Sequence, residues 1–493
     1  MAQEKRKPEK VTFFIDKQAS FSEWYTEIIA RAELADIRYN VKGFLVFQPW
    51  SVIPMEKMYD FLEEILQRKG HQPYWYPAVI PEKNFHLEKE HVEGFAPEVF
   101  WVTEHGAGEP LEEKLALRPT SETAFYQMFA LWIRSHKDLP FKTYQRAQVF
   151  RYETKATRPF LRSREFYWVE AHDAFATHEE ALAQVKEDME TTQEFLWEKL
   201  AIPSIFFQRP QWDKFAGAVN TYAADTLMPD GKIVQLPSTH DLGQNFSKPF
   251  NVTFKGKNGK DEFAYLTCYG PAVSRIFAAL FSMHGDNKGL RFPFEVAPKQ
   301  IVIIPIATDK DSKVLPFCQK LAAELQKQGY RVELDASEKM PGEKFYFWEM
   351  KGVPLRIEIG PKELKQKKLV VYRRDILQKE TIPAKGLKKW IEKTGKTATE
   401  TLKKEAGHLF DNSIRNAESF QELKKELECR GFVRVNFCSD ENEGIECAEK
   451  IEKELFANVR GKRVDKEEKP FGQQKCAVCG RAARMVLYIA KQY

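Results

Sequence analysis

The sequence predicts a multidomain α/β protein whose largest domain is built on an antiparallel sheet. Two runs rich in aromatic and β-branched residues, FKTYQRAQVFRYE and RSREFYWVEAH, flank a polar loop, which is typical of an antiparallel strand pair. From about Ala297, apolar strand-like runs alternate with helical runs, which indicates a compact α/β domain. A charged helical stretch at about 380–430 then leads into a cysteine-bearing tail.

The composition is that of a globular chain with material for several cores. Of its 493 residues, 43% are hydrophobic and 30% are charged. No apolar run approaches the ~20 residues that span a bilayer, and no leader-like segment opens the chain, so we expect a cytoplasmic protein without membrane association. The net charge of +5 permits nucleic-acid contact without requiring it. Seven dispersed cysteines argue against a disulfide framework and leave metal binding or burial.

The first part of the chain predicts three helices and one irregular strand. SFSEWYTEIIARAELAD has Ser20 and Glu23 at the spacing of a capping box. In PMEKMYDFLEEILQRKG, apolar residues repeat on one helical face, with Pro54 near the start and Gly70 at the end, and we expect this face to pack on a sheet. The run HQPYWYPAVIP contains prolines, so it is expected at a sheet edge or an interface. TSETAFYQMFALWIRSH is expected to be a helix.

The elements that follow the strand pair complete two domains. HEEALAQVKEDMETTQEFLWEKL is a long helix with Thr177 and Glu180 as a second capping box, and VQLPSTHDLGQNF and the helix SRIFAALFSMHG come after it. In the α/β region, the strands QIVIIPIA, YRVELDA, VPLRIEIG and KLVVYRR are interspersed with the helices SKVLPFCQKLAAELQKQG and GEKFYFWEMKG.

The strand pair carries a dense cluster of charge. Four arginines, three glutamates and a histidine lie between Phe150 and His172. Arginines on adjacent strands present rigid forks that suit phosphate and carboxylate oxygens, so the cluster predicts an anion site. The acidic and aromatic candidates for orienting these forks or stacking on a ring are Glu153, Glu165, Glu170, Phe166 and Trp168. On composition alone, a salt-bridged strand pair on a solvated surface is an equal alternative.

Several ordered motifs resemble class II aminoacyl-tRNA synthetases. VFRYE, the loop and REFYWVEAH resemble motif 2 of that class, HQPYWYPAVIP resembles motif 1, and YGPAVSRIFAALFSMHGD resembles motif 3. HVEGFAPE, LRPTSET, THDLGQNFSK and GVPLRIEIGPKEL are similar to prolyl-tRNA synthetases of the archaeal and eukaryotic type. The likeness runs from about Phe21 to Tyr493. It implies an enzyme that activates L-proline with ATP to prolyl-adenylate and transfers the prolyl group to the 3′ end of tRNA(Pro).

The resemblance also implies a domain division and partners. It divides the chain into an N-terminal tail (1–19), a class II catalytic domain (20–296), an anticodon-binding domain (297–394) and a small α+β zinc-binding-like domain (395–493). Mg²⁺ is expected with the ATP, because phosphate oxygens require a hard cation. Motif 1 implies a homodimer, which would cover the apolar helix that leads into Pro77.

The resemblance assigns the charged cluster to catalysis and ATP binding. Arg151 is expected to contact both the α-phosphate and the substrate carboxylate, where charge develops in the transition state. Arg275, at the motif 3 position, is expected on the γ-phosphate. The other ATP-binding candidates are Glu153 at the adenine edge, Phe166 stacked on the base, Arg162 from the loop, and Gln235. No general base is expected, because positioning and charge neutralisation carry this chemistry.

A proline pocket needs a carboxylate for the secondary ammonium, a cation for the carboxylate and an apolar wall. The resemblance assigns Thr120 and Glu122 of TSET to the imino nitrogen and Arg151 to the carboxylate. The residues matching the rest of the pocket are Trp168, Glu170, His172, Ser238 and His240. Ser238 is expected to replace a threonine common in the family. Taken singly, Trp168 is more often a core residue and a lone histidine more often structural, but their joint match favours the pocket.

The remaining assignments concern RNA and metal. RNA loops are read by aromatic stacking and by hydrogen bonds to base edges, and the anticodon candidates are Phe345, Trp348, Glu349, Arg356 and Glu358. An amphipathic helix would bury Phe345 and Trp348 without any RNA. The tail holds four cysteines that can close a tetrahedral Zn²⁺ site, Cys438, Cys447, Cys476 and Cys479, with a set of buried thiols as the alternative. Cys429 is a weaker candidate. Tyr493 matches a terminal tyrosine whose carboxylate folds toward the catalytic domain in similar proteins.

Two other functions stay open at this point. A catalytically silent relative could bind RNA or regulate a partner, and another class II synthetase would share motifs 1 to 3. Only about 60 residues separate Asp173 from Gln235, too few for the inserted editing domain of bacterial-type relatives. We therefore expect an enzyme that has no domain of its own to deacylate alanyl-tRNA.

Overall fold

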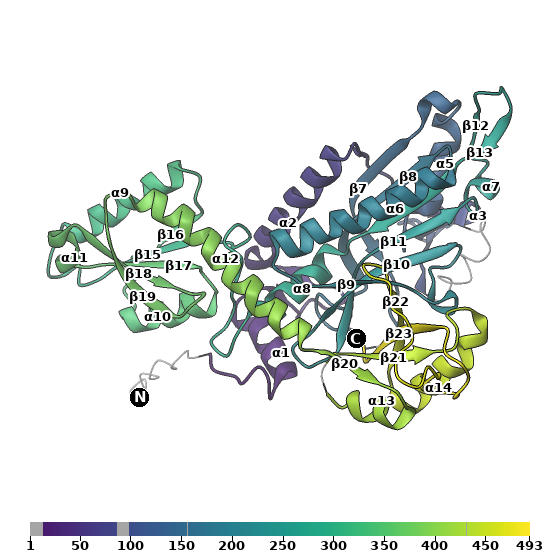
Figure 1. Ribbon diagram of the computed structural model, residues 1–493. Helices are drawn as coiled ribbons and strands as arrows, with labels where there is room; N and C mark the ends of the chain where they lie inside the picture. The colour runs from purple at the N-terminus through teal and green to yellow at the C-terminus, as the bar shows by residue number, and fades with distance from the viewer. Residues whose placement is uncertain (1–12, 86–97, 155, 430) are drawn as a thin grey trace.

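The computed structural model describes residues 13–85, 98–154, 156–429 and 431–493, and it is organised around two sheets (Figure 1). The HVEGFAPE segment lies outside these ranges apart from Glu98, as does most of the expected N-terminal tail. The large sheet has eleven strands in the order β20-β21-β23-β22-β9-β10-β11-β14-β8-β7-β3, and a separate sheet has five. Within the described ranges, no helix has the length and apolarity needed to cross a membrane. The predicted multidomain α/β class, with a largely antiparallel sheet in the largest domain, is confirmed.

The centre of the large sheet is antiparallel, as the sequence predicted. Its strands are β7 (Phe141–Phe150), β8 (Glu165–Phe175), β9 (Ile205–Gln208), β10 (Asn220–Leu227), β11 (Ile233–Gly243) and β14 (Tyr265–Gly270). Strands β7 and β8 pair from Phe141 opposite Ala174 to Phe150 opposite Glu165. The two aromatic-rich runs are therefore neighbouring strands, and the polar loop joins them.

Helices lie on both faces of the large sheet. They are α1 (Phe21–Arg31), α2 (Pro49–Arg68), α5 (Glu122–Trp132), α6 (His178–Gln193), continued by a π-helical turn at Glu194–Lys199, and α8 (Val273–His284). Helix α5 packs on the face of His172, where its Phe125 ring lies 4.0 Å from the His172 ring, and the other four helices lie on the opposite face. Helix α6 contacts β8, β11 and β14, and Figure 1 shows it running beside β8 and β11. The Thr177–Glu180 capping box that begins α6 is confirmed, because Thr177 accepts from the Glu180 backbone and Glu180 caps the Thr177 backbone.

Two local predictions in the first helices are wrong. Ser20 is the N-cap of α1, but its side chain makes no capping hydrogen bond, because its backbone ψ of 50° departs from the extended conformation that a capping side chain needs. Pro54 lies inside α2, which already begins at Pro49. The apolar face of α2 packs against α8 and the π-helical end of α6, and α2 also contacts the sheet at β3 and at β7, where Gln67 donates to the Tyr144 hydroxyl, so the expected packing on a sheet is present.

The proline-rich run HQPYWYPAVIP splits between two sheets. Its first part forms β3 (Gln72–Pro73), which is an edge strand of the large sheet, as its prolines predicted. Its last part forms β4 (Val79–Pro81) in a three-stranded sheet with β5 (Phe100–Glu104) and β6 (Pro110–Leu117). The small remaining elements of this region are β1 (Ala35–Asp36), β2 (Val46–Phe47), α3 (Glu82–Phe85), α7 (Ser247–Phe250), β12 (Thr253–Lys255), β13 (Asp261–Phe263) and the 3₁₀ turns His136–Asp138 and Gln211–Asp213.

The five-stranded sheet forms a separate α/β unit, seen at the left of Figure 1. Its strand order is β16-β15-β17-β18-β19, and β15 is parallel to both of its neighbours. The elements are β15 (Ile301–Pro305), α9 (Val314–Lys327), β16 (Val332–Leu334), α10 (Pro341–Met350), β17 (Leu355–Ile359), α11 (Pro361–Gln366), β18 (Lys368–Arg373) and β19 (Gln378–Pro383). All strands and helices predicted in this unit are present, and the structure adds α11 and β19.

The C-terminal region extends the large sheet. Helix α12 (Leu387–Asp411) runs from the α/β unit toward this region and contains the expected 394/395 division (Figure 1). The elements beyond it are β20 (Ile414–Ala417), α13 (Phe420–Glu426), β21 (Phe432–Phe437), a 3₁₀ turn (Asn442–Gly444), α14 (Ile445–Leu455), β22 (Asn458–Arg463) and β23 (Met485–Ala490). Strand β22 pairs with β9, with Lys462 opposite Gln208. At this junction Gly461 has a φ of +113°, and a Cβ there would collide with the Gln208 carbonyl oxygen, so the close approach requires glycine.

Candidate functional site

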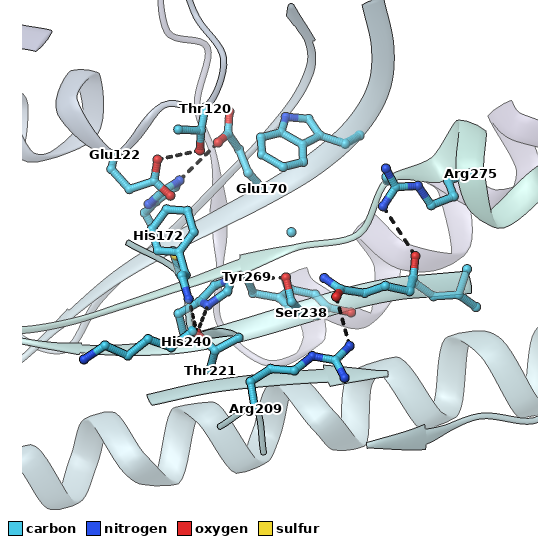
Figure 2. A pocket seen from close by; sticks show the side chains of 18 of the residues that line it. Thr120, Glu122, Glu170, His172, Arg209, Thr221, Ser238, His240, Tyr269 and Arg275 are labelled. Carbon is cyan, nitrogen blue, oxygen red and sulfur yellow. Dashed lines mark hydrogen bonds and ion pairs between the residues drawn. The ribbon is translucent and has the colours of Figure 1, made fainter. Parts of the chain in front are cut away.

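A cavity of about 230 Å³ lies on the catalytic sheet (Figure 2). Eleven of the residues predicted for proline or ATP line it: Thr120, Glu122, Arg151, Phe166, Trp168, Glu170, His172, Gln235, Ser238, His240 and Arg275. Four of them are alternate residues of β8, from Phe166 to His172, because successive side chains of a strand point to opposite faces. The period of the strand therefore gathers an aromatic wall, a carboxylate and an imidazole on one surface.

A second cavity of about 150 Å³ holds the two remaining ATP candidates. Glu153 and Arg162 line it, and it shares Arg151, Phe166 and Arg275 with the first cavity. Arg162 forms an ion pair with Glu153 at 3.7 Å. All residues predicted for proline and ATP thus border two cavities that have three lining residues in common. Glu165, the further acidic candidate, lines neither cavity.

Two buried carboxylates form the acidic side of the cavity. Glu122 accepts a hydrogen bond of 2.5 Å from the Thr120 hydroxyl. Glu170 accepts from the Ser121 hydroxyl at 2.5 Å and from Gln145 Nε2 at 2.7 Å, and it lies 3.2 Å from His172 Nε2. These hydroxyl and amide donors hold the two carboxylates in place on one side of the cavity. The arrangement therefore suits a cationic group.

Two arginines, Arg151 and Arg275, line the same cavity. Arg151 Nε donates to the Pro119 carbonyl at 3.0 Å, and its guanidinium lies 5.2 Å from the Phe166 ring centroid. Arg275 Nε donates to the Leu161 carbonyl at 3.2 Å. Burial, with added repulsion from Arg151 and Arg162, lowers the pKa of Arg275 to about 10, so it remains charged at neutral pH. Like charges brought together in this way favour an anionic ligand.

His240 is held as a neutral imidazole. Its Nδ1 lies 2.9 Å from the Thr221 hydroxyl and its Nε2 lies 3.1 Å from the Ser238 hydroxyl. Burial lowers its pKa to about 4, with repulsion from His172 and Arg209 adding to the effect. His240 therefore offers hydrogen bonding and shape to the cavity, and no positive charge.

Sequence reasoning missed several residues of the cavity wall: Arg209, Asp213, Lys214, Phe215, Thr221, Leu236, Cys268, Tyr269, Gly270 and Ala272. Arg209 and Asp213 belong to a polar segment that directly follows the strand run SIFFQ, and this position was a usable signal. Thr221 lies inside β10, and only the pairing of that strand with β11 brings it beside His240.

The anticodon candidates separate into two groups. Arg356 donates to Glu358 at 3.1 and 3.0 Å, and its guanidinium lies 4.3 Å from the Phe345 ring centroid. Trp348 donates to Asp335 at 2.8 Å and its ring lies 6.1 Å from that of Trp50 in α2.

Glu349 is buried, and it accepts from the Tyr372 hydroxyl at 2.5 Å and from Lys288 at 3.2 Å. Trp348 and Glu349 thus have their polar atoms bonded to residues that were not anticodon candidates. The other three candidates, Phe345, Arg356 and Glu358, contact one another in a single cluster.

The four predicted cysteines of the tail converge. The Sγ atoms of Cys438, Cys447, Cys476 and Cys479 all lie within 4.8 Å of one another, and the first two are 3.8 Å apart. Sulfurs around a tetrahedral Zn²⁺, with Zn–S bonds of ~2.3 Å, are separated by roughly 3.8 Å. Burial opposes ionisation of Cys479, but hydrogen bonds from Arg481 outweigh it and lower its pKa to about 6. The donor set fits a zinc ion. Cys429 is exposed and lies outside the group.

The C-terminal residue contacts Arg162, which lines the second cavity. Arg162 Nη2 donates at 3.0 Å to the terminal carboxylate of Tyr493, and the Tyr493 hydroxyl donates to Asp230 at 2.6 Å. The expected fold-back of the terminal residue toward the catalytic residues is therefore present.

Comparison with known proteins agrees with this geometry. A family model for the tRNA synthetase class II core domain (G, H, P, S and T) matches residues 100–284, an anticodon binding domain matches 300–394, and a prolyl-tRNA synthetase C-terminal domain matches 420–493. Proline–tRNA ligase of Thermofilum pendens is 50% identical over 97% of this chain and 98% of its own. The corresponding protein of Pyrococcus abyssi is 42% identical, covering 96% and 98%.

A solved structure is similar over the whole fold. It is the Giardia lamblia prolyl-tRNA synthetase in complex with prolyl-adenylate, which is 36% identical, has a TM-score of 0.94 and covers 98% of this chain and 100% of its own. The matched models, the full-length identity and the fold lead to one conclusion: the chain belongs to the prolyl-tRNA synthetase family of class II aminoacyl-tRNA synthetases.

Proposed function

We propose that the cavity on the catalytic sheet is the place where this chain carries out the reaction of its family. That reaction is the ATP-dependent activation of L-proline to prolyl-adenylate, followed by transfer of the prolyl group to tRNA(Pro). The observation that carries the assignment is the pairing of a buried acidic side, Glu122 and Glu170, with two arginines, Arg151 and Arg275, around one cavity. An amino acid and a nucleoside triphosphate together present one ammonium group, one carboxylate and several phosphate charges. The acidic side matches the ammonium group, and the arginines match the anions.

For proline, we propose a pocket between the carboxylates and Trp168. Glu122, oriented by its bond from Thr120, holds the secondary ammonium, and Glu170 with His172 supports that end. Trp168 forms the apolar wall. Its Cζ3 would lie only 3.2 Å from a Cβ at Gly270, so the glycine leaves room for the indole. Ser238 and His240 close the opposite side through their mutual hydrogen bond.

For ATP, we propose that Arg151 contacts the α-phosphate together with the proline carboxylate. The carboxylate attacks the α-phosphorus, pyrophosphate leaves, and the positive charge of Arg151 stabilises the transition state. Arg275 and Arg162 bind the departing phosphates, Phe166 stacks on adenine, and Gln235 and Glu153 contact the nucleoside. Mg²⁺ bound to the phosphates would neutralise further charge, and Glu98 is a hard oxygen donor that lines the second cavity.

For tRNA, we propose that the cluster of Phe345, Arg356 and Glu358 contributes to anticodon recognition, because an aromatic ring, a guanidinium and a carboxylate lie together there. Trp348 and Glu349 are proposed at the border of this cluster, where their polar atoms bond to Asp335 and Tyr372. After activation, the terminal ribose hydroxyl of the tRNA attacks the adenylate carbonyl, and AMP leaves.

For the tail, we propose a structural Zn²⁺ held by the four clustered cysteines. The fit of their separations to a tetrahedral sulfur set supports it. Bound zinc would join residues that are distant in sequence, and Arg481, which donates to Cys479 at 3.2 Å, would partly balance the charge of the thiolates.

We also propose a homodimer formed through the motif 1 region. A groove of about 660 Å³ lies between α2 and the edge of the sheet, and Trp75 in its lining is 91% exposed. Val46 and Val52 of the same groove are exposed as well. Apolar groups gathered at a sheet edge favour burial by a second copy. Light scattering that finds a monomer at micromolar concentration would overturn this proposal.

The domain division at 19/20, 296/297 and 394/395 and a cytoplasmic location remain proposals drawn from the family. The last division falls inside α12, so the α/β unit and the C-terminal region share one continuous helix. Limited proteolysis with mapping of the cut sites tests the first two divisions.

Amino-acid-dependent exchange of pyrophosphate into ATP tests the proposed function as a whole. The purified chain is assayed with each of the twenty amino acids in separate reactions. Exchange with proline far above the others is expected. No exchange with any amino acid would favour a silent relative, and strong exchange with a different amino acid would assign another class II activity.

A further inference from the structure

A row of polar side chains crosses four neighbouring strands and joins the C-terminal region to the wall of the cavity. The strands lie in the order β22-β9-β10-β11. Arg460 belongs to β22, Arg209 follows the end of β9, Asp225 belongs to β10, and Gln235 belongs to β11. Asp225 and Gln235 are direct cross-strand partners. Gln235 and Arg209 line the cavity, and Figure 2 shows Arg209 on its floor.

Asp225 is the centre of the row. Arg209 donates to its two oxygens at 3.0 and 2.8 Å, and Arg460 donates to the same two oxygens at 2.8 and 3.1 Å. All three side chains are buried, and the exposed fraction is 0% for Asp225. Burial opposes its ionisation, but the two guanidiniums hold the pKa of Asp225 below its usual range. One carboxylate thus orients two rigid forks at once.

The trio of Arg209, Asp225 and Arg460 carries one more positive than negative charge, and a contribution to folding stability alone does not explain it. Two cations share one anion in the interior, and buried ion pairs of this kind are often no more stabilising than apolar residues of equal volume. The other donors of the arginines reach neutral oxygens: Arg209 donates to the Arg460 carbonyl at 2.7 Å, and Arg460 donates to Gln492 at 2.5 Å. Asp213, which lines the cavity, interacts electrostatically with both arginines. The charge balance of the trio therefore involves the cavity.

The row fixes the orientation of one amide. Arg209 Nη2 lies 2.9 Å from Gln235 Oε1. A guanidinium can only donate, so the amide oxygen must face Arg209 and the amide nitrogen must point away from it. The backbone carbonyl of Gln235 is held separately by Arg275 at 3.4 Å. The side-chain NH₂ of Gln235 is thus held in one orientation, because Arg209 binds the amide oxygen and Arg275 binds the backbone carbonyl of the same residue.

We propose that Arg460 is a positioning residue for the activation reaction. It acts through Asp225 and Arg209 to hold the Gln235 amide ready for ATP, so that a strand of the C-terminal region completes the nucleotide site. This inference rests on the ATP-binding role proposed for Gln235. It gives the pairing of β22 with β9 a purpose beyond packing, because only that pairing brings Arg460 within reach of Asp225.

The test is a double-mutant cycle in proline-dependent pyrophosphate exchange on the full chain. The variants are R460M, Q235A and their combination, and R463M is the matched control. Arg463 lies on the same strand but pairs with Asp465. We expect R460M to raise the KM for ATP about tenfold and to change the KM for proline less than about twofold, which is the size of coupling seen for residues in one network. R463M should leave both constants unchanged.

The combined variant separates positioning from a general loss of stability. If Arg460 acts through Gln235, R460M adds less than about twofold to the KM for ATP in the Q235A background. An equal effect in both backgrounds, or no effect of R460M on wild type, overturns the inference. A normal KM for ATP in Q235A instead removes the ATP role proposed for Gln235, and the inference with it.

A second variant covers a loss of folding. R460M leaves Asp225 paired with Arg209, so we expect folded protein, which circular dichroism checks at the assay temperature. R460K keeps the charge but lacks the planar fork that binds both oxygens. If R460M is unfolded, R460K takes its place in the cycle, and a wild-type KM for ATP in R460K overturns the inference.

Discussion

Replacing Arg151 by alanine is the perturbation that addresses the chemical step most directly. The guanidinium lies between the two cavities, and its Nε is engaged by the Pro119 carbonyl, which aims the two terminal nitrogens. Alanine would remove the charge while leaving the acidic side, Glu122 and Glu170, in place. The two substrate groups proposed to contact Arg151, the α-phosphate of ATP and the carboxylate of proline, would then lose a charged donor and face the carboxylates of Glu122 and Glu170.

The size of the loss follows from the number of contacts. A hydrogen bond to a charged group contributes ~1.5–3 kcal/mol, so two such bonds correspond to about 3–6 kcal/mol and roughly a 10²- to 10⁴-fold fall in rate. Because the charge on the α-phosphate region develops during the attack, most of this loss should fall on kcat. Arg151→Lys keeps a charge without the fork, and it is expected to retain an intermediate rate.

Proline-dependent pyrophosphate exchange measures this effect. Initial rates are taken over ranges of ATP and proline, and circular dichroism confirms that each variant is folded. Arg134→Ala is the control, because this exposed arginine lies near the end of α5 and lines neither cavity. A folded Arg151→Ala protein that exchanges within about threefold of wild type would refute the reasoning, since a charged donor at the reacting phosphate is worth at least ~100-fold.

Three further predictions concern stability, metal and specificity. Burial, with repulsion from Asp173, raises the pKa of Asp188 to about 7, so the stability that this group contributes is present at acidic pH and is lost as pH rises from about 4 through about 7. The melting temperature of Asp188→Asn minus that of wild type should therefore be larger at pH 8 than at pH 5. An equal difference at the two pH values would contradict the shift. Cys479→Ser should lower the zinc content measured by plasma mass spectrometry while Cys429→Ser leaves it unchanged, and equal zinc in both would remove the proposed site. Alanine lacks methylenes worth only about 1–3 kcal/mol each, so alanyl-adenylate should form detectably. Between α6 and β11 the chain holds only β9, β10 and short turns, which leaves no room for an editing domain. We therefore expect no enzyme-dependent release of alanine from preformed alanyl-tRNA with the proline anticodon. Release well above the buffer rate would contradict this expectation.

The charged strand pair is the clearest case in which sequence and structure agree. Because strand side chains alternate, the spacing of Phe166, Trp168, Glu170 and His172 already implied one shared face, and the structure places all four around the cavity. The Thr177 capping box agrees for the same reason, since its partner is only three residues away. Ser20 has the same spacing to Glu23 and makes no such bond, because the local backbone angle turns its hydroxyl elsewhere. Spacing therefore determines an interaction only where the backbone adopts the assumed conformation.

The sequence by itself determined the order of the elements, the class of the fold, the family and most residues of the cavity, because each depends on neighbours within a few positions or on motifs preserved in order. Only the tertiary structure decided that the C-terminal strands continue the catalytic sheet. The pairing of β22 with β9 joins segments about 250 residues apart, and it brings Arg460 to Asp225 and, through Arg209, to Gln235. Such contacts arise from strand register and burial across the whole sheet, which no local pattern of residues specifies.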